Sequence, residues 1–246
     1  MKQPVTRERR VQLDRGETEA THLAEVLAVD FAKLMANVAP GLPASAITPM
    51  RNAAKRGITL RMQGAATLLR VHGHGDHAQW SRHASDTVRG WACYLIGSDP
   101  GLSLEHKLDA LRALADDAHF GVREWAWLAV RPHIVSEPLR VLTHLHGWST
   151  DASPNVRRFA CEALRPRGVW AAHIALFKQE PHHALPLLHA LCCDASRYVQ
   201  DSVGNWLNDA GKSQPDWVRA LCSEWQQRHA DDPANTYIRK RALRSL

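Results

Sequence analysis

The sequence predicts an all-α protein built as a curved α-solenoid of antiparallel helix pairs. Apolar residues recur at i, i+3, i+4 and i+7 along almost the whole chain, which is the spacing of one helix face. Alternating runs rich in β-branched residues, the pattern of strands, are nearly absent. One short motif also returns at intervals of 34 to 43 residues, and internal repetition of this kind is typical of solenoids.

Proline and glycine divide the chain into helices of about 10 to 20 residues joined by short turns. In chain order, the breaks lie at 40–43, 56–57, 73–75, 99–101, 131–132, 166–168, 180–181, 214–215 and 232–233. Short helices with short turns favour antiparallel neighbours. Residues 1–18 are predicted to be a mobile, basic tail, and residues 19–246 are predicted to be a single repeat domain.

The repeated motif marks the second helix of each pair. It reads VRGWA from Val88, VREWA from Val122, VRRFA from Val156, VQDSV from Val199 and IRKRA from Ile238. The copies lie 34, 34, 43 and 39 residues apart, and each follows a helical segment and a turn. This interval with a VRxxA helix start indicates HEAT-like repeats. A single repeat cannot bury its apolar face, so the pairs must stack.

The register of the motif separates a buried stripe from a polar face. At about 100° per residue, positions 0, +3, +4, +7 and +8 from the Val or Ile form the stripe. Trp91, Trp125 and Trp206 fall on it, so we interpret them as packing residues, with stacking on bases as the alternative. Positions +2, +6 and +9 point away and form a polar ladder. Its members are Gly90 and Tyr94, Glu124 and Arg131, Arg158, Glu162 and Arg165, Asp201, Asn205 and Asn208, and Lys240 and Arg244.

Two carboxylates occupy the same +2 position of this ladder, Glu124 and Asp201. Equivalent positions on stacked helices align, usually on the concave surface, so both side chains are expected to face one groove among arginines. An ordinary solvated helix face is the alternative. A groove that bound only phosphates would gain affinity by losing the two carboxylates, which favours a separate task for them.

Arginine recurs at position +1 of the motif, at Arg89, Arg123, Arg157 and Arg239. In HEAT-like repeats this residue commonly binds neighbouring turns and ties repeats together, so a structural role is expected. Phosphate contact is the alternative.

Composition limits the partners and the compartment. The chain has 246 residues, 45% of them hydrophobic, with a formal net charge of +6 and 15 histidines. An anionic partner such as nucleic acid is therefore favoured over an acidic substrate. The five cysteines form no C-x-x-C pair and most lie in apolar stretches, as reduced thiols do in the cytoplasm. No run of about 18 apolar residues is present, so neither secretion nor membrane insertion is expected.

Five segments together carry a family resemblance. They are SDTVRGWACYLIG, HFGVREWAWLAVRPHI, NVRRFACEALRPRGVWAAHI, RYVQDSVGNWLNDAGKSQPDWV and IRKRALRSL. In this order they resemble the DNA alkylation repair HEAT-like-repeat glycosylases, the AlkC/AlkD family, and the AlkC side of it most. The resemblance covers residues 80–246 well and the first 75 residues poorly.

The resemblance implies an activity and a mechanism. Family members excise positively charged N-alkylated bases such as 3-methyladenine from duplex DNA bound on the concave surface, without fully flipping the base and without a metal or other cofactor. A base that already carries a positive charge leaves as a neutral molecule. The sugar left behind resembles an oxocarbenium ion, which a carboxylate stabilises while orienting water. Glu124 is predicted to be the principal catalytic residue, with Asp201 assisting or substituting for it.

The DNA contacts implied by the resemblance lie mostly on the basic part of the ladder. The predicted set is Arg158, Arg165, Arg167, Trp170, Asn205, Lys240 and Arg244. Trp170 and Trp127 are possible aromatic contacts, although packing is preferred for each. Asn205 stands beside the place where the AlkD side has a second aromatic residue, which favours an AlkC-like arrangement. The domain 19–246 would act as a monomer on DNA, cytoplasmic and associated with the nucleoid when bound.

Two other functions remain open. In a non-catalytic HEAT-repeat scaffold that binds DNA or protein, Glu124 and Asp201 would pair with neighbouring arginines. The segment HGHGDH at 72–77 has the H-x-H-x-D-H spacing of metallo-β-lactamase-fold hydrolases. That fold needs the motif after a strand and further ligands on later strands, whereas the flanking residues read as helices. We therefore interpret HGHGDH as a turn, at most an opportunistic metal-binding one.

Overall fold

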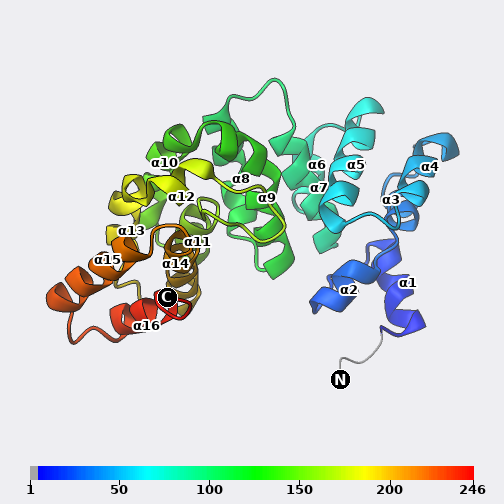
Figure 1. Cartoon of the computed structure of the whole chain (residues 1–246). Helices are drawn as coiled ribbons and strands as arrows, with labels where there is room; N and C mark the ends of the chain where they lie inside the picture. The colour runs from blue at the N-terminus through cyan, green and yellow to red at the C-terminus, as the bar shows by residue number, and fades with distance from the viewer. Residues whose placement is uncertain (1–4) are drawn as a thin grey trace. The chain divides into compact units, whose positions relative to one another are not determined.

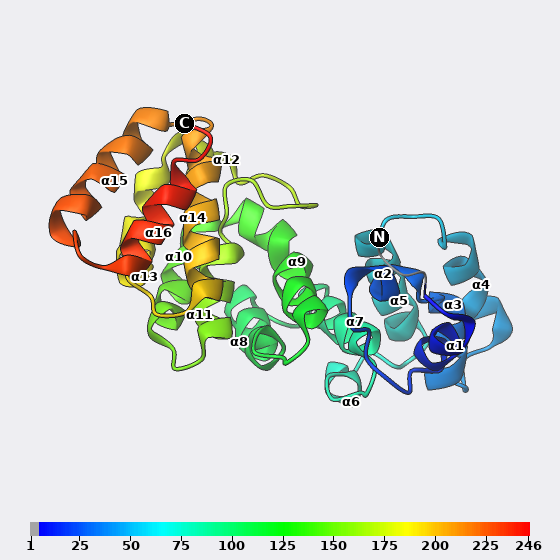
Figure 2. The same cartoon turned by 90° about the horizontal axis from the view of Figure 1, so that it is seen from below.

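The computed structural model describes residues 5–246, and its regular elements in that range are all helices. The chain forms two compact units, Met1–Ala129 and Val130–Leu246, so the single domain predicted for 19–246 is divided at Ala129. Figures 1 and 2 label the α-helices. The prediction of an all-α fold is confirmed. Within the described range, no helix is both long and apolar enough to cross a membrane.

Unit 1 holds the first helices of the chain. They are α1 (Arg7–Arg15), α2 (Leu23–Ala28), α3 (Phe31–Val38), α4 (Ala44–Asn52), α5 (Ile58–Val71), α6 (His77–Trp80), α7 (Asp86–Gly97), α8 (Leu104–Ala115) and the first part of α9 (Phe120–Ser136). Helix α1 packs on α3, and α5 packs on α7 (Figure 1).

Helix α1 occupies much of the segment that the sequence suggested was a mobile tail. Leu13 is 1% exposed, and the Arg9 guanidinium makes a 2.9 Å ion pair with the buried carboxylate of Glu25. Gly16 ends the helix with φ of 73°, in the left-handed region that suits glycine. The described part of the segment is therefore folded against unit 1, while residues 1–4 lie outside the described residues.

Unit 2 holds the remaining helices. They are the last part of α9, α10 (Pro138–His146), the 3₁₀ turn η1 (Gly147–Thr150), α11 (Pro154–Glu162), α12 (Ala175–Gln179), the 3₁₀ turn η2 (Pro181–Ala184), α13 (Leu185–Leu191), α14 (Arg197–Gly211), α15 (Pro215–Arg228) and α16 (Pro233–Ala242). Helix α14 packs between α11 and α16, and the views in Figures 1 and 2 agree on this order.

The motif residues lie where the register placed them. Val88, Val122, Val156, Val199 and Ile238 are all fully buried, and so are Trp91 and Trp206, while Trp125 is 4% exposed. The packing role of the three tryptophans is confirmed. The last copy differs in one respect: α16 begins five residues before Ile238, because Asp232 caps it by accepting from the Asn235 N–H and Pro233 suits its first turn.

The arginine at +1 of the first three motif copies ties its helix to the turn before it. Arg89 and Arg157 each donate to the backbone carbonyls five and six residues earlier, and Arg123 does the same. Arg89 also bonds both carboxylate oxygens of Asp117, and Arg157 both oxygens of Asp194. These aspartates precede the following copy of the motif. The structural role predicted for this arginine is confirmed at Arg89, Arg123 and Arg157, whereas Arg239 bonds the side chains of Asn235, Thr236 and Gln226.

The polar ladder is mostly covered by the next repeat. A Cβ at Gly90 would lie 2.4 Å from the ring of Trp125, and Tyr94, Arg131, Arg158, Glu162, Arg165 and Asn208 are all buried. In unit 2 the cause is visible: Ser202 on α14 donates to Glu162 on α11, and Asn208 on α14 donates to the Ala242 carbonyl on α16. Only part of the ladder stays accessible, namely Glu124, Asp201 and Asn205 in part, and Lys240 and Arg244 more fully.

Candidate nucleic-acid interface

Glu124 lies on α9 in unit 1 with its side chain partly exposed. Its carboxylate Oε2 accepts a hydrogen bond of 2.9 Å from the indole Nε1–H of Trp127, one turn further along the helix. Trp127 is 1% exposed, and Trp125 beside it packs on Gly90. A buried indole therefore orients the carboxylate of a partly exposed glutamate.

Such a carboxylate can act on a developing positive charge or on water. The indole N–H is a donor only, so it can orient the carboxylate by a hydrogen bond and cannot act as a base toward it. The packing predicted for Trp127 is confirmed, and the hydrogen bond to Glu124 is a second role. Sequence alone offered one sign of it, the i, i+3 spacing that places the two side chains on one helix face.

Asp201 lies on α14 in unit 2 and has a 37% exposed side chain. Its Oδ1 accepts from the Tyr237 hydroxyl at 2.6 Å and lies 3.2 Å from Nη1 of Arg241. Both partners come from α16, which packs alongside α14 in Figures 1 and 2. The Asp201 charge is thus partly neutralised by a cation that the sequence reasoning did not single out.

Asn205 belongs to the same cluster. Its side-chain oxygen accepts from Nε of Arg241 at 3.0 Å, one turn along α14 from Asp201. Arg241 also donates to the Tyr237 hydroxyl, and the Arg197 guanidinium lies 3.4 Å from the centre of the Tyr237 ring. The helices can approach here because Gly204 has no side chain: a Cβ would lie 2.8 Å from Cβ of Arg241. Asn205 therefore holds an arginine in place.

Arg158 and Arg165 are not surface cations. Arg165 makes 2.7 Å ion pairs with Glu162 and Asp209, and Arg158 lies 3.5 Å from Glu162 and stacks over the ring of Tyr198. Burial alone would raise the pKa of Glu162, but the two guanidiniums lower that pKa below its ordinary value. The predicted phosphate contact does not fit Arg165, because both ends of its guanidinium are bound to buried carboxylates.

The remaining predicted contacts are more accessible. Lys240 is exposed, Arg244 is exposed and donates to the Arg241 carbonyl, and Arg167 is partly exposed and donates to the Asp209 carbonyl and the Ser213 hydroxyl. Trp170 is 66% exposed and has a left-handed φ of 58°. Packing was the preferred interpretation of Trp170, and its exposure shows that this was wrong.

A buried arginine shapes the segment that carries Trp170. Arg131 donates to the carbonyls of Ala163, Arg165 and Ala172 at 2.6, 2.7 and 2.9 Å. Burial lowers the pKa of Arg131 to about 10. Figure 2 shows the long non-helical connection between α11 and α12 to which these carbonyls belong. Arg131 was expected on the polar ladder, and it serves instead as the internal anchor of this connection.

The HGHGDH segment forms the turn between α5 and α6. Asp76 caps α6 by accepting from the Ala78 N–H, and the His74 carbonyl accepts from the indole of Trp80. Gly73 takes a φ of 81°. Among the residues that the structure describes, the two groups able to hold a metal ion lie elsewhere. The interpretation of this segment as a turn fits the all-helical surroundings.

Comparison with known proteins points to one family. The family model described as DNA alkylation repair enzyme matches residues 122–246, about half of the chain. The uncharacterized protein YhaZ of Bacillus subtilis (strain 168) is 34% identical over 143 residues, which cover 58% of this chain and 38% of that protein. The match thus spans well under half of the length of this relative.

Solved structures share the fold. The chain is similar to the Pseudomonas fluorescens alkylpurine DNA glycosylase AlkC bound to DNA containing an abasic site analog, with a TM-score of 0.71 and 24% identity over 95% of this chain and 62% of AlkC. It is also similar to AlkD2 from Streptococcus mutans, with a TM-score of 0.58 and 23% identity over 82% of this chain and 87% of AlkD2. The predicted HEAT-like class of fold is confirmed.

Proposed function

Since this chain belongs to the DNA alkylation repair enzyme family, we propose that it is a monofunctional DNA glycosylase that hydrolyses the N-glycosidic bond of positively charged N-alkylated bases, such as 3-methyladenine, in duplex DNA. The observation that carries this proposal is the carboxylate of Glu124, partly exposed on α9 and oriented by the buried indole of Trp127. The solved structure of AlkC with abasic DNA supports the same class of partner.

Glu124 acts in this proposal on the sugar and not on the base. The alkylated base leaves as a neutral molecule and needs little help from an acid. Positive charge then develops at C1′ of the deoxyribose, where a fixed carboxylate stabilises it and orients the attacking water. The Trp127 N–H holds that carboxylate before DNA binds, so less reorganisation is needed in the transition state.

Asp201 has a secondary role in this proposal. Its partners Arg241 and Tyr237 offset its charge and occupy one of its oxygens, which weakens it as a stabiliser of a cation. It assists by positioning Arg241, which Asn205 also holds.

The accessible cations and Trp170 bind the DNA. Lys240, Arg244 and Arg167 contact phosphates, and Trp170 stacks on a base or wedges beside one. Arg158 and Arg165 act only by stabilising unit 2. The protein works as a monomer in the cytoplasm, associated with the nucleoid when it is bound to DNA.

Base release from defined lesions tests the proposal. Glu124→Gln keeps the side-chain size and an oxygen for the Trp127 N–H, so we expect it to abolish 3-methyladenine release and to keep binding to abasic-site DNA. Glu137→Gln, at an exposed glutamate paired with Arg140, is the matched control and should release the base like the wild type. Near-wild-type excision by Glu124→Gln would remove Glu124 from the mechanism.

A non-catalytic DNA- or protein-binding scaffold is the second candidate. The pairing of Asp201 with Arg241 favours it, because a scaffold would use such carboxylates as internal ion-pair partners. Wild-type protein that binds alkylated duplex DNA and releases neither 3-methyladenine nor 7-methylguanine, with or without chelator, would establish this alternative.

A further inference from the structure

Two adjacent cysteines and a histidine meet in unit 2, at residues that the proposed function does not use. Cys192 and Cys193 follow α13, and His229 follows α15. The Sγ atoms of the two cysteines are 3.7 Å apart, and Sγ of Cys192 is 3.8 Å from Nε2 of His229. All three ligand atoms lie within 4.8 Å of one another. Both thiols are free.

These separations are the edges of a metal tetrahedron. Zinc binds thiolate sulfur at about 2.3 Å and imidazole nitrogen at about 2.0–2.1 Å, so tetrahedral geometry places two sulfurs about 3.8 Å apart and a sulfur and a nitrogen about 3.6 Å apart. The observed distances of 3.7 and 3.8 Å match two of these edges, and the third pair of ligand atoms lies within 4.8 Å. We propose that Cys192, Cys193 and His229 bind a Zn²⁺ ion.

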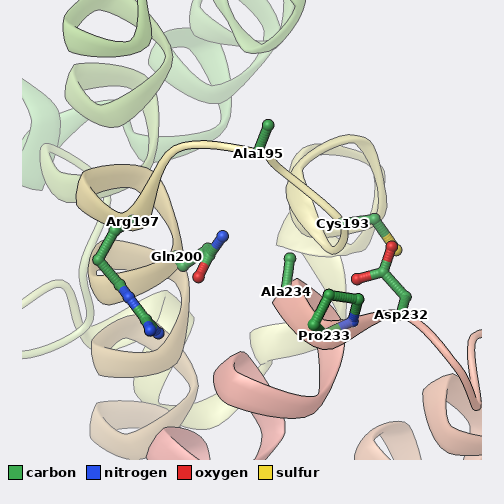
Figure 3. A pocket seen from close by; sticks show the side chains of 7 residues that line it. All are labelled: Cys193, Ala195, Arg197, Gln200, Asp232, Pro233 and Ala234. Atoms are coloured by element: carbon green, nitrogen blue, oxygen red, sulfur yellow. The ribbon is translucent and has the colours of Figure 1, made fainter.

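Asp232 lies beside Cys193, outside the group of three whose ligand atoms are all within 4.8 Å of one another. One of its carboxylate oxygens accepts the Asn235 N–H that caps α16. Figure 3 shows the carboxylate beside the Cys193 sulfur, at the edge of a cavity of about 450 Å³ that Arg197 and Gln200 also line. A water molecule admitted through the cavity, or the second carboxylate oxygen after a movement of the Asp232 side chain, completes four-coordination.

The backbone around the site is held independently of any metal. The Asn235 side chain donates to the Cys192 carbonyl at 3.1 Å, and Arg239 in turn donates to the Asn235 oxygen at 2.8 Å. The Asp232 N–H donates to the His229 carbonyl, which closes the turn between α15 and α16. The ligands are therefore presented by three segments that are already bonded to each other, and zinc would join them directly.

The chemistry of the donors selects zinc over harder cations. Thiolate and imidazole ligands suit Zn²⁺, whereas Mg²⁺ and Ca²⁺ prefer oxygen. Zinc binds cysteine as the thiolate, so binding releases protons from the two thiols and strengthens as pH rises. The site carries no step of base excision. Its role is to clip the turn after α13 to the turn before α16 and so stabilise the end of unit 2.

Cobalt substitution tests the site in the full-length, reduced protein. One equivalent of Co²⁺ should produce thiolate-to-cobalt charge-transfer absorption, and Zn²⁺ should displace it. Cys192→Ser and His229→Ala should each weaken binding by more than about 100-fold, since changes of outer-shell residues alone cost about 10–100-fold. Asp232→Asn identifies the fourth ligand. The variant should bind cobalt more weakly if the carboxylate coordinates the metal, and with near wild-type affinity if a water molecule does.

Two controls guard the assignment. Cys222→Ser removes a buried thiol outside the cluster and should leave the cobalt spectrum unchanged. His183→Ala disrupts the other potential group, Glu180, His182 and His183, which lacks sulfur and cannot give the thiolate band. If Cys192→Ser fails to fold by circular dichroism, Cys193→Ser replaces it, and Zn²⁺ should then raise the unfolding midpoint of the wild type alone. Absence of the thiolate band, or its persistence without Cys192 or Cys193, would overturn the proposal.

Discussion

Replacing Arg165 with methionine separates two roles of an arginine that the sequence alone could not distinguish. The guanidinium lies between the buried carboxylates of Glu162 and Asp209, each at 2.7 Å, with side-chain exposures of 5% to 9% for all three residues. Methionine preserves the length of the side chain and its packing but removes the charge. The two carboxylates then remain buried with weaker partners.

The size of the effect follows from this burial. Removing one partner of a buried ion pair costs about 3–5 kcal/mol. Arg158 still lies 3.5 Å from Glu162, and the half-exposed Lys212 lies 3.5 Å from Asp209, which places the expected loss near the lower end, at about 3 kcal/mol. For a chain of this size, a loss of about 3 kcal/mol lowers the midpoint of thermal unfolding by roughly 6–12 °C.

Urea and thermal unfolding measure the loss of stability. The dependence of DNA affinity on salt concentration measures whether the arginine contacts phosphate. Below its unfolding transition, Arg165→Met should keep the wild-type salt slope. Arg244→Met is the control at an exposed arginine: its stability should stay within about 0.5 kcal/mol of the wild type, and its slope should fall by about one. Wild-type stability for Arg165→Met together with a reduced salt slope would refute the assignment of Arg165 to the interior.

Two further predictions concern unit 1 and the exposed tryptophan. The hydrogen bond from Arg9 lowers the pKa of Glu25 from 4.5 to about 2. The ionised Glu25 therefore stabilises the fold above about pH 4.5, and this stabilisation is lost as the pH falls toward 2. The Glu25→Gln variant should lack this acid-dependent loss of stability, and an unchanged pH profile would contradict the reasoning. Trp170→Ala should weaken DNA binding by about 1–3 kcal/mol with wild-type thermal stability, whereas a loss of stability at unchanged affinity would show that the indole packs.

Local rules predicted the parts of the fold that depend on helix register. The period of 3.6 residues was enough to place Trp91 and Trp206 in the core, and the recurrence of Arg89 and Arg157 one position after the motif start was enough to suggest a tie between repeats. Both inferences depend only on the spacing of residues along one helix and on the need for repeats to stack. A single sequence is enough to show both.

The same register failed where the next repeat covers a helix or where a helix ends. Arg165 lies beyond the end of α11, and its partner Asp209 is 44 residues away, so no local spacing could reveal the ion pair. Trp170 belongs to a non-helical connection, where apolar character does not indicate burial. The folded α1 was missed because its charges looked solvated, although Arg9 pairs with Glu25 sixteen residues later.

The candidate site was predictable in its residues more than in their partners. The equivalence of Glu124 and Asp201 in the repeat singled out both carboxylates, but the indole beside one and the guanidinium beside the other make them chemically different. The cysteines at 192 and 193 lack the C-x-x-C spacing that signals a metal site, and His229 comes from a different helix pair. Only the packing of α13, α15 and α16 brings them together.

The anchor formed by Arg131 has a consequence for the entropy of recognition. If Trp170 stood on a loose loop, ordering the loop on binding would cost about 1–2 kcal/mol of backbone conformational entropy for each residue fixed. Three hydrogen bonds from one buried guanidinium already hold the backbone on both sides of Trp170, so most of this loss occurs during folding. The indole is presented as a preorganised probe, and its contact energy becomes available to binding nearly undiminished.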